Sequence, residues 1–388
     1  MNTVIAIFSL VRSALVLERG LDDAAVALAM SIFLFSLALG GIVGGLVLAF
    51  VTPRILTLAA AALFGGGWFL AGSAYDPVSL HLTLGVMGGF GAGLVYNPAI
   101  SLTLGWFPDH PGMVSGIILG AGAIGPAALA PLFAAAVSEW GVGTALRLLG
   151  AVLAVFTLVG AVTLRAPRAP ETTRARRALR ERLLPLRSPR FWMIFALFAI
   201  VTTPGNMTVS ALAGIVDVQL AEAVTDTRAL GLLLVTTLPF ANFGGRLLFG
   251  ALFDRWGPVV PLALCLAGTG ASLIGLLAAR DVLSFAIALY GLGVVFGSTL
   301  VLFPPLTARE FGYDDLPLVY GVMFVGYAAG GLMGPLLTGV LADPGAGTGG
   351  YSGAYLAALA LCLVGAILLA VLRRTPRARP VEAPGARG

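Results

Sequence analysis

Arg246 lies well inside a long apolar run of the sequence. A charged side chain at the centre of a bilayer costs about 2.5–3.5 kcal/mol on insertion scales, so it rarely persists there without a partner or a task. Its planar guanidinium suits a carboxylate, which it can bind through two parallel hydrogen bonds. Asn242, one helical turn earlier, could donate an amide N–H to the same anion or steady the guanidinium. We expect this pair to contact an anion. The alternative is a structural role in which Arg246 extends to the inner membrane surface.

Other polar side chains occur inside apolar runs, beside a proline. Tyr96 and Asn97 precede Pro98, and Asn206 follows Pro204. A proline frees a backbone carbonyl, and irregular backbone at membrane depth is tolerated where it lines a cavity. These three polar residues are therefore candidate cavity groups, with hydrogen bonding between helices as the alternative.

Two tyrosines and a second arginine complete the predicted substrate-binding set. Tyr290 and Tyr327 carry hydroxyl groups that could hydrogen-bond a carboxylate, although packing is the more common role of such residues. Arg12 lies near the outer end of the first apolar run, where it would either attract anions into a cavity or extend to the membrane surface. The full set is Arg246, Asn242, Tyr96, Asn97, Asn206, Tyr327, Tyr290 and Arg12.

The acidic residues are informative by their positions. Glu18, Asp217 and Asp254 lie at the ends of apolar runs, and no acid lies deep within one. A fixed intramembrane carboxylate is the usual proton carrier in pumps and transporters. Proton symport would therefore need an acid at a helix end or a proton carried with the anion, whereas anion exchange needs neither. The sequence leaves both couplings open.

The sequence carries no nucleotide-binding P-loop, catalytic triad or metal-ligand spacing. His81 and His110 are far apart, and Cys265 and Cys362 both lie inside apolar runs, so neither a metal site nor a disulfide framework is indicated. We predict that the protein is not an enzyme and needs no cofactor or metal.

The composition indicates a membrane protein. Of the 388 residues, 59% are hydrophobic and only 11% are charged, whereas soluble domains carry about 25% charged residues. So few charges cannot cover a water-facing surface. All 23 basic residues are arginines, and because they are distributed over short loops rather than one folded face, we expect no nucleic-acid binding.

Twelve apolar segments are candidates for the roughly 20-residue helices that cross a bilayer. Basic loops stay in the cytoplasm, and an N-terminus inside places 17 arginines on the cytoplasmic side against 4 outside. We therefore expect a multi-pass protein of the cell (inner) membrane with both termini cytoplasmic. The first segment is short, either because the assigned start is internal, which we favour, or because the helix begins at depth. The segments are Asn2–Leu17, Ala24–Phe50, Ile55–Ala74, Val78–Phe107, Met113–Ser138, Gly143–Leu164, Phe191–Val216, Ala229–Phe253, Val259–Ala279, Val282–Ala308, Leu316–Leu341 and Ala354–Leu372.

An arginine- and proline-rich stretch separates six segments from six. The halves repeat one another: Gly45 to Pro53 matches Gly250 to Pro258 at an offset of 205, with further matches at offsets of 206 and 209. Parallel halves of this kind bind substrate near the midplane and rock around it. We predict a six-helix bundle over 1–164, a cytoplasmic linker over 165–190, a second six-helix bundle over 191–375 and a cytoplasmic tail over 376–388.

The segment Gly250–Pro258 resembles the cytoplasmic-loop signature of the major facilitator superfamily. In that family an acid and a base after the helix end latch neighbouring helices in one state of the cycle. The resemblance implies a gating motif of Gly250, Asp254, Arg255 and Gly257. Ala49 and Phe50 occupy the matching first-half positions, so the first-half latch is incomplete. The family fold is an all-α integral membrane protein with twelve transmembrane helices in two pseudo-symmetric six-helix bundles, here with a shortened first helix.

Two further segments resemble the oxalate/formate antiporter and monocarboxylate transporter group. These are Tyr96-Asn97-Pro98 with the glycine-rich run that follows, and Asn242 to Arg246, where the group's arginine pairs with the substrate carboxylate. The oxalate carriers use a lysine in the eleventh helix for the second carboxylate, and this chain has Tyr327 there. The resemblance therefore implies a monocarboxylate rather than a dicarboxylate.

We accordingly expect secondary active transport of a small organic anion by alternating access, with protons as a further candidate partner. The protein is expected to lie in the lipid bilayer and to work as a monomer. One alternative is a drug or metabolite exporter of the same fold, which would favour a larger apolar cavity and cationic substrates. The other is a membrane sensor that does not transport.

Overall fold

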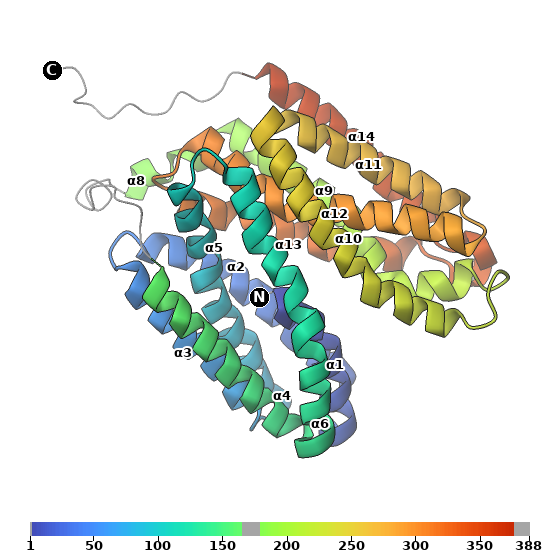
Figure 1. Cartoon of the computed structure of the whole chain (residues 1–388), viewed down its shortest axis with the longest axis horizontal. Coiled ribbons are helices and arrows are strands. Elements are labelled where there is room, and N and C mark those ends of the chain that lie inside the picture. Colours follow the sequence, from blue (N-terminus) through green and yellow to red (C-terminus); the bar gives the residue numbers. More distant parts are fainter. Residues whose placement is uncertain (1, 165–178, 376–388) are drawn as a thin grey trace. The chain divides into compact units, whose positions relative to one another are not determined.

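The computed structural model describes residues 2–164 and 179–375, in which every regular element is a helix (Figure 1). Residues 165–178 of the predicted linker and the predicted tail, 376–388, lie outside the described part. The elements are α1 (Asn2–Arg19), α2 (Asp23–Val47), α3 (Pro53–Ala71), α4 (Pro77–Leu80), the π-helix η1 (His81–Gly88), α5 (Gly89–Trp106), α6 (Pro111–Thr163), α8 (Leu179–Arg182), the 3-10 helix η2 (Leu184–Arg187), α9 (Pro189–Gln219), α10 (Thr227–Trp256), α11 (Val259–Ala278), α12 (Val282–Phe311), α13 (Leu316–Leu341), the 3-10 helix η3 (Pro344–Gly349) and α14 (Ser352–Arg374).

The predicted all-helical membrane class is confirmed, and each of the twelve predicted segments coincides with helical residues, although two of them, Ala24–Phe50 and Ile55–Ala74, extend three residues past the ends of α2 and α3. Within the described residues, ten helices are long and apolar enough to cross a membrane, and 111–122 forms a shorter apolar helix. Large apolar side chains point outward on many of them; Val340 is 79% and Ile287 is 65% exposed. Such a surface would associate in water, but it is the surface that a bilayer solvates.

The fifth and sixth predicted segments form one element, α6, with a break at Gly141. This glycine has φ 77° and ψ 164°, a conformation that side chains with a Cβ disfavour. The N–H of Val142, directly after the break, donates to the carboxylate of Glu18 at 2.7 Å. The carboxylate of Glu18 therefore caps the helix where it begins again after the break. The polar residues between the two predicted segments indicate a break at this place.

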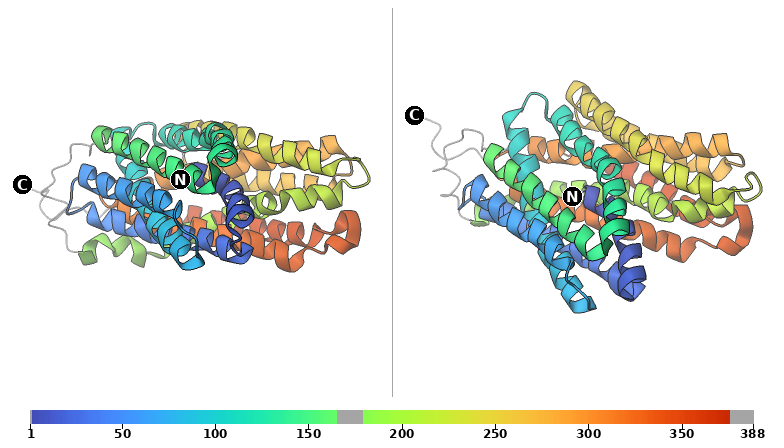
Figure 2. Two further views of the ribbon diagram at one scale, coloured as in Figure 1. Left: turned by 90° about the horizontal axis from the view of Figure 1, so that it is seen from below. Right: turned by 60° about the horizontal axis from the view of Figure 1, so that its bottom comes forward.

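Close helix packing in the first part of the chain depends on glycine. A Cβ at Gly40 in α2 would lie 2.2 Å from the carbonyl oxygen of Phe90, and one at Gly93 in α5 would lie 2.1 Å from that of Leu37. The backbones of α2 and α5 can approach this closely only because neither position carries a side chain. The two helices lie side by side (Figure 2).

The described chain forms two compact units, and each unit contains segments from both halves of the sequence. Unit 1 contains residues up to Pro108, 122–185 and Phe311–Phe324, and unit 2 contains Asp109–Ala121, Leu186–Glu310 and the rest from Val325. The start of α6 thus packs with the second half of the sequence, and the start of α13 packs with the first half. The predicted boundaries at 164 and 191 remain a prediction.

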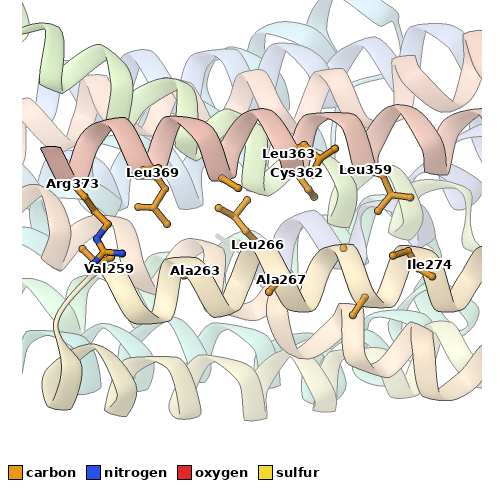
Figure 3. A pocket seen from close by; sticks show the side chains of 14 residues that line it. Val259, Ala263, Leu266, Ala267, Ile274, Leu359, Cys362, Leu363, Leu369 and Arg373 are labelled. Carbon is orange, nitrogen blue, oxygen red and sulfur yellow. The ribbon is translucent and has the colours of Figure 1, made fainter. Parts of the chain in front are cut away.

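Two helices of unit 2, α11 and α14, pack against each other along their lengths with opposite chain directions. Val259 at the start of α11 faces Arg373 near the end of α14, and Ile274 lies toward Leu359 at the other end (Figure 3). Small residues on α11 keep a long apolar hollow between them.

Candidate functional site

Arg246 lies in the second half of α10, where its side chain is buried with 6% of its surface exposed. Its Nε donates a hydrogen bond to Oδ1 of Asn242 at 2.8 Å, and its Nη1 donates to the backbone carbonyl of Leu119 in α6. The Asn242 contact joins residues one turn apart on the same helix face, as the sequence predicts. The guanidinium is therefore fixed in place by a side chain and by a neighbouring backbone.

The start of α6 approaches α10 closely beside this arginine. A Cβ at Gly116 would lie 2.7 Å from the carbonyl oxygen of Arg246, and one at Gly120 would lie 3.1 Å from the ring of Phe243. These two glycines, one turn apart, present a smooth face to α10. That contact brings the Leu119 carbonyl within reach of the guanidinium.

Tyr327 of α13 is close enough to interact electrostatically with Arg246. Its ring packs against Phe198 of α9, with 5.8 Å between centroids. Helices α10 and α13 and the start of α6 thus contribute to the surroundings of this arginine. Of the predicted site residues, the structure brings Asn242 into contact with Arg246 and places Tyr327 within electrostatic range of it.

Asn206 and Tyr290 also belong to unit 2, but their described hydrogen bonds are not to Arg246 or Asn242. The amide of Asn206 donates to the carbonyl of Thr202 at 2.9 Å, within the turn of α9 that contains Pro204. The hydroxyl of Tyr290 shares a hydrogen bond with Thr237 of α10 at 2.5 Å. Both residues are half-buried, and their predicted role in binding stays a prediction.

The three remaining predicted site residues lie in unit 1. Arg12 is 42% exposed and forms a two-point ion pair with Asp23 at the start of α2, including Nε to Oδ1 at 2.6 Å. The Tyr96 ring packs against Phe324 with 5.1 Å between centroids. Asn97 is fully buried against Gly41 of α2, and its amide has no hydrogen-bond partner within the described residues.

The residues of the predicted gating motif lie together in unit 2, at the end of α10 and in the turn after it. Asp254 accepts hydrogen bonds from the N–H groups of Gly112 at 2.7 Å and Met113 at 2.8 Å. A carboxylate on the first N–H groups of a helix satisfies unpaired donors and complements the helix dipole. Gly257 has φ 72°, which allows the turn, and the guanidinium of Arg255 lies over the Trp256 ring. Asp254 thus holds the start of α6.

Unit 1 contains a second charged contact that the sequence reasoning missed. Nε of Arg182, in the short α8, donates to Oδ1 of Asp315 at 2.8 Å, and Nη2 donates to the carbonyl of Gly45 at 3.2 Å. The side chains are only 7% and 14% exposed. Asp315 directly precedes α13, so Arg182 connects the linker segment, the end of α2 and the start of α13.

The glycine contacts of the two units match at a constant spacing. A Cβ at Gly45 would lie 2.5 Å from the carbonyl of Pro317, and one at Gly250 would lie 2.5 Å from that of Gly112. Gly250 lies 205 positions after Gly45, and Pro317 lies 205 positions after Gly112. The pair Gly321 and Gly41 relates to Gly116 and Arg246 by the same 205 residues. Equivalent backbone contacts therefore occur in both units, but Ala49 occupies the position that matches Asp254.

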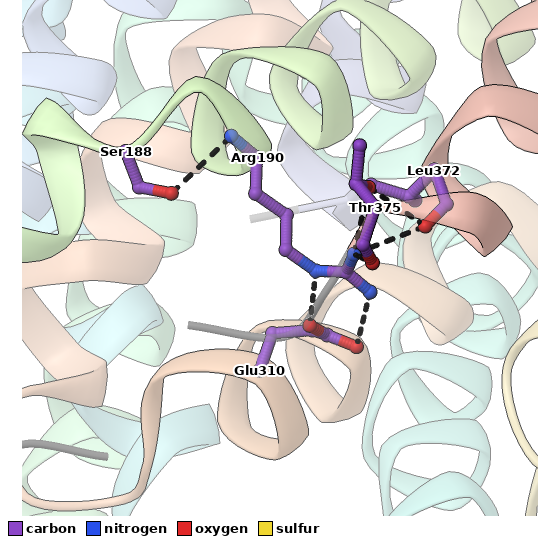
Figure 4. Close-up of polar contacts among 5 residues, drawn as sticks. All are labelled: Ser188, Arg190, Glu310, Leu372 and Thr375. Atoms are coloured by element: carbon purple, nitrogen blue, oxygen red, sulfur yellow. Dashed lines mark hydrogen bonds and ion pairs between the residues drawn. The ribbon is translucent and has the colours of Figure 1, made fainter. Parts of the chain in front are cut away.

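A second buried ion pair lies at the end of α12. Arg190, at the start of α9, contacts Glu310 with Nε to Oε2 at 2.5 Å and Nη2 to Oε1 at 3.2 Å (Figure 4). Its Nη1 also donates to the carbonyls of Leu372 at 3.0 Å and Thr375 at 2.8 Å. Arg190 thereby joins α9, α12 and the end of α14. Sequence reasoning assigned this arginine only to the linker charge.

Among the described residues, no group of three or more His, Cys, Asp or Glu side chains is placed to hold a metal ion.

Comparison with known proteins identifies the family. The Major Facilitator Superfamily profile matches residues 1–312 and, in a second match, 205–388. The oxalate:formate antiporter of Oxalobacter formigenes is 25% identical over 303 residues, which cover 75% of this chain and 69% of that protein. Human monocarboxylate transporter 11 is 28% identical over 349 residues, covering 85% of this chain and 70% of that protein. The Escherichia coli fucose:proton symporter FucP shares the fold, with a TM-score of 0.71, 14% identity and 96% coverage of each chain. The chain belongs to the Major Facilitator Superfamily and has the twelve-helix fold of its membrane transporters.

Proposed function

We propose that the protein carries a small organic monoanion, most simply a monocarboxylate, with Arg246 as the partner of its carboxylate. The observation that carries the proposal is a buried guanidinium oriented by Asn242 and by the Leu119 carbonyl. Orienting contacts of this kind lower the cost of fixing the arginine for two-point recognition of an anion. A membrane protein with a resident cation at this depth favours an anionic rather than a cationic cargo.

The relatives support the same chemical class. Their names describe exchange of oxalate for formate and transport of monocarboxylates. Tyr327 occupies the position where the oxalate carriers are expected to have a second cation, and it lies in electrostatic range of Arg246. A phenol can donate one hydrogen bond to a bound carboxylate but supplies no second positive charge. This favours one carboxylate over two.

The two charged latches support alternating access as the mechanism. Asp254 holds the start of α6 to the end of α10, and Arg182 holds the start of α13 to the end of α2. Both sets of contacts involve predicted cytoplasmic loops of an inner-membrane protein. We propose that both latches are closed when the cytoplasmic side is closed, and that they open together to release cargo inward.

Transport of labelled anions into proteoliposomes tests the proposal. Uptake of radiolabelled lactate, pyruvate, formate and oxalate would be compared for the wild type, Arg246→Ala and Arg228→Ala. Arg228 is an exposed arginine at the other end of the same helix, so it serves as a matched control. We expect saturable uptake of one or more monocarboxylates, its loss in Arg246→Ala and its retention in Arg228→Ala.

Two outcomes would contradict the proposal. Equal uptake by the wild type and Arg246→Ala would remove Arg246 from the mechanism. Preference for cationic drugs over all four anions would favour an exporter of the same fold. A pH-sensitive dye inside the same vesicles distinguishes proton symport, which acidifies the lumen during uptake, from anion exchange, which requires an internal anion instead.

A further inference from the structure

The hollow between α11 and α14 has the form of a binding groove for a chain-like apolar molecule. It encloses about 750 Å³ and is lined from Val259 to Ile274 on one helix and from Leu359 to Arg373 on the other (Figure 3). At 1.5 Å per residue, the lining of α11 is about 22 Å long. Its floor consists of small side chains: Ala263, Ala267, Gly270, Ala271, Ala366 and Ala370.

The floor is open rather than crowded. A Cβ at Gly270 would meet only the Cδ2 of Leu359, at an ordinary contact distance of 3.9 Å. The lining residues Ala267 and Ala366 are exposed. Exposed small side chains along this length therefore leave room for a hydrocarbon chain against both helices.

The two ends of the groove differ in polarity. At the Val259 end it adjoins a second hollow of about 310 Å³, which shares Val259, Leu369 and Arg373 with the groove and adds Arg190, Glu310 and Thr375. Arg373 is exposed and forms no ion pair with any residue in the described part of the chain. Away from this end, every lining residue is apolar, glycine or cysteine.

Further positive charge gathers at the same end. Nη1 of Arg309 would lie 2.9 Å from a Cβ at Gly257, which is two residues before α11 begins. No side chain caps the first N–H groups of α11, so the helix dipole adds to the positive potential. Glu310 is already engaged by Arg190 through two contacts (Figure 4). The net charge of this end therefore complements an anion.

We propose that this groove is a binding site for an anionic phospholipid. The phosphate would lie beside Arg373 and the start of α11, and an acyl chain would lie along the alanine floor between α11 and α14. We infer this occupant because the groove is long and apolar and ends at basic side chains. An anionic lipid at the inner leaflet has the matching pattern, an apolar chain that ends in a negatively charged headgroup. This inference does not depend on the cargo or on Arg246.

Native mass spectrometry of the purified protein tests the site. Protein in detergent would be mixed with phosphatidylglycerol or, as the neutral-headgroup control, phosphatidylcholine of the same acyl chains. We expect the wild type to retain phosphatidylglycerol preferentially. Arg373→Gln should lower that retention by about fivefold, since a basic residue at a membrane surface contributes roughly 1 kcal/mol toward anionic lipid. Arg374→Gln, which changes the neighbouring arginine outside the lining, should have a smaller effect.

Filling the groove gives a second, independent test. Ala267→Trp should abolish preferential retention of phosphatidylglycerol, whereas Ala360→Trp, on an exposed face of α14 outside the lining, should leave it unchanged. Circular dichroism and size-exclusion chromatography would establish that each variant is folded. Equal retention of both lipids by the wild type, or unchanged retention in both Arg373→Gln and Ala267→Trp, would overturn the proposal. A dimer of the wild-type chain that Ala267→Trp converts to a monomer would overturn the proposal as well, because the groove would then hold a second copy of the chain.

Discussion

The ion pair between Arg182 and Asp315 gives the most quantitative prediction. Its Nε–Oδ1 distance is 2.8 Å, and the side chains are 7% and 14% exposed. Removing one partner of a buried pair costs about 3–5 kcal/mol. Asp315→Asn keeps a hydrogen-bond acceptor beside the guanidinium, and neither side chain is completely buried, so we expect about 2–3 kcal/mol. The substitution therefore destabilises the state in which the start of α13 is packed against α2, relative to the state in which the two have separated.

That cost predicts a change in the accessibility of the start of α13. Leu318 is 1% exposed in the packed state, so a cysteine introduced there should react with a maleimide only when the start of α13 leaves α2. If opening is fast compared with labelling, Asp315→Asn should raise the labelling rate by about 30- to 150-fold, at 1.4 kcal/mol per factor of ten. The background would carry Cys265→Ser and Cys362→Ser, which replace the two native cysteines.

Charge exchange separates the ion pair from general destabilisation. The double variant Arg182→Asp with Asp315→Arg should return the rate toward that of the wild type, because the opposite charges are restored. Asp314→Asn, at the exposed neighbouring acid, is the control and should change the rate much less. A wild-type labelling rate in Asp315→Asn, or a double variant that labels as fast as Asp315→Asn, would refute the latch.

Three further predictions follow from the same contacts. Ser115 is a fully buried position on α6, and a cysteine there would report when the start of α6 separates. Asp254→Ala should raise the rate of maleimide labelling of Ser115→Cys by at least tenfold, because two charge-assisted hydrogen bonds to the helix start are lost. An unchanged rate would mean that Asp254 does not hold α6. Gly45→Ala should open the α13 contact in the Leu318→Cys assay, because its Cβ would lie 2.5 Å from the Pro317 carbonyl, whereas Gly339→Ala meets nothing within 4 Å and should be silent. Hydrogen bonds from the backbone N–H and the side chain of Ser284 hold the pKa of Asp281 below its ordinary value. The difference in stability between the wild type and Asp281→Ala should therefore be present at neutral pH and disappear as the pH falls through the lowered pKa. A difference in thermal unfolding that persists at low pH would contradict this role.

The helices could be predicted because their signals are local. Apolar runs of membrane-spanning length identified all ten helices of the described residues that are long and apolar enough to cross a membrane, and the polar residues before Gly141 marked the break in α6. The motif around Asp254 named an acid at a helix end, and its partners are backbone N–H groups, which every sequence supplies. Asn242 lies one turn from Arg246, so helix geometry alone predicts their contact.

The remaining contacts could not be predicted because their partners lie far apart in the sequence. Arg182 and Asp315 are separated by 133 positions, and Arg190 and Glu310 by 120. Each of these four residues taken alone resembles an ordinary charged loop residue. The burial of Asn97 depends on Gly41 in another helix, and no local pattern distinguishes a polar residue packed in this way from one that lines a cavity.

Discrimination between a carboxylate and its neutral amide separates a substrate-binding role of Arg246 from a structural one. Equilibrium binding of radiolabelled pyruvate and pyruvamide to purified protein would be compared in the wild type, Arg246→Ala and Arg228→Ala, with the acid that is transported best replacing pyruvate if necessary. We expect the wild type and Arg228→Ala to prefer the acid by about 10- to 150-fold, the range for hydrogen bonds to charged groups, and Arg246→Ala to lose this preference. An undiminished preference for the acid in Arg246→Ala would show that Arg246 is not the partner of the carboxylate.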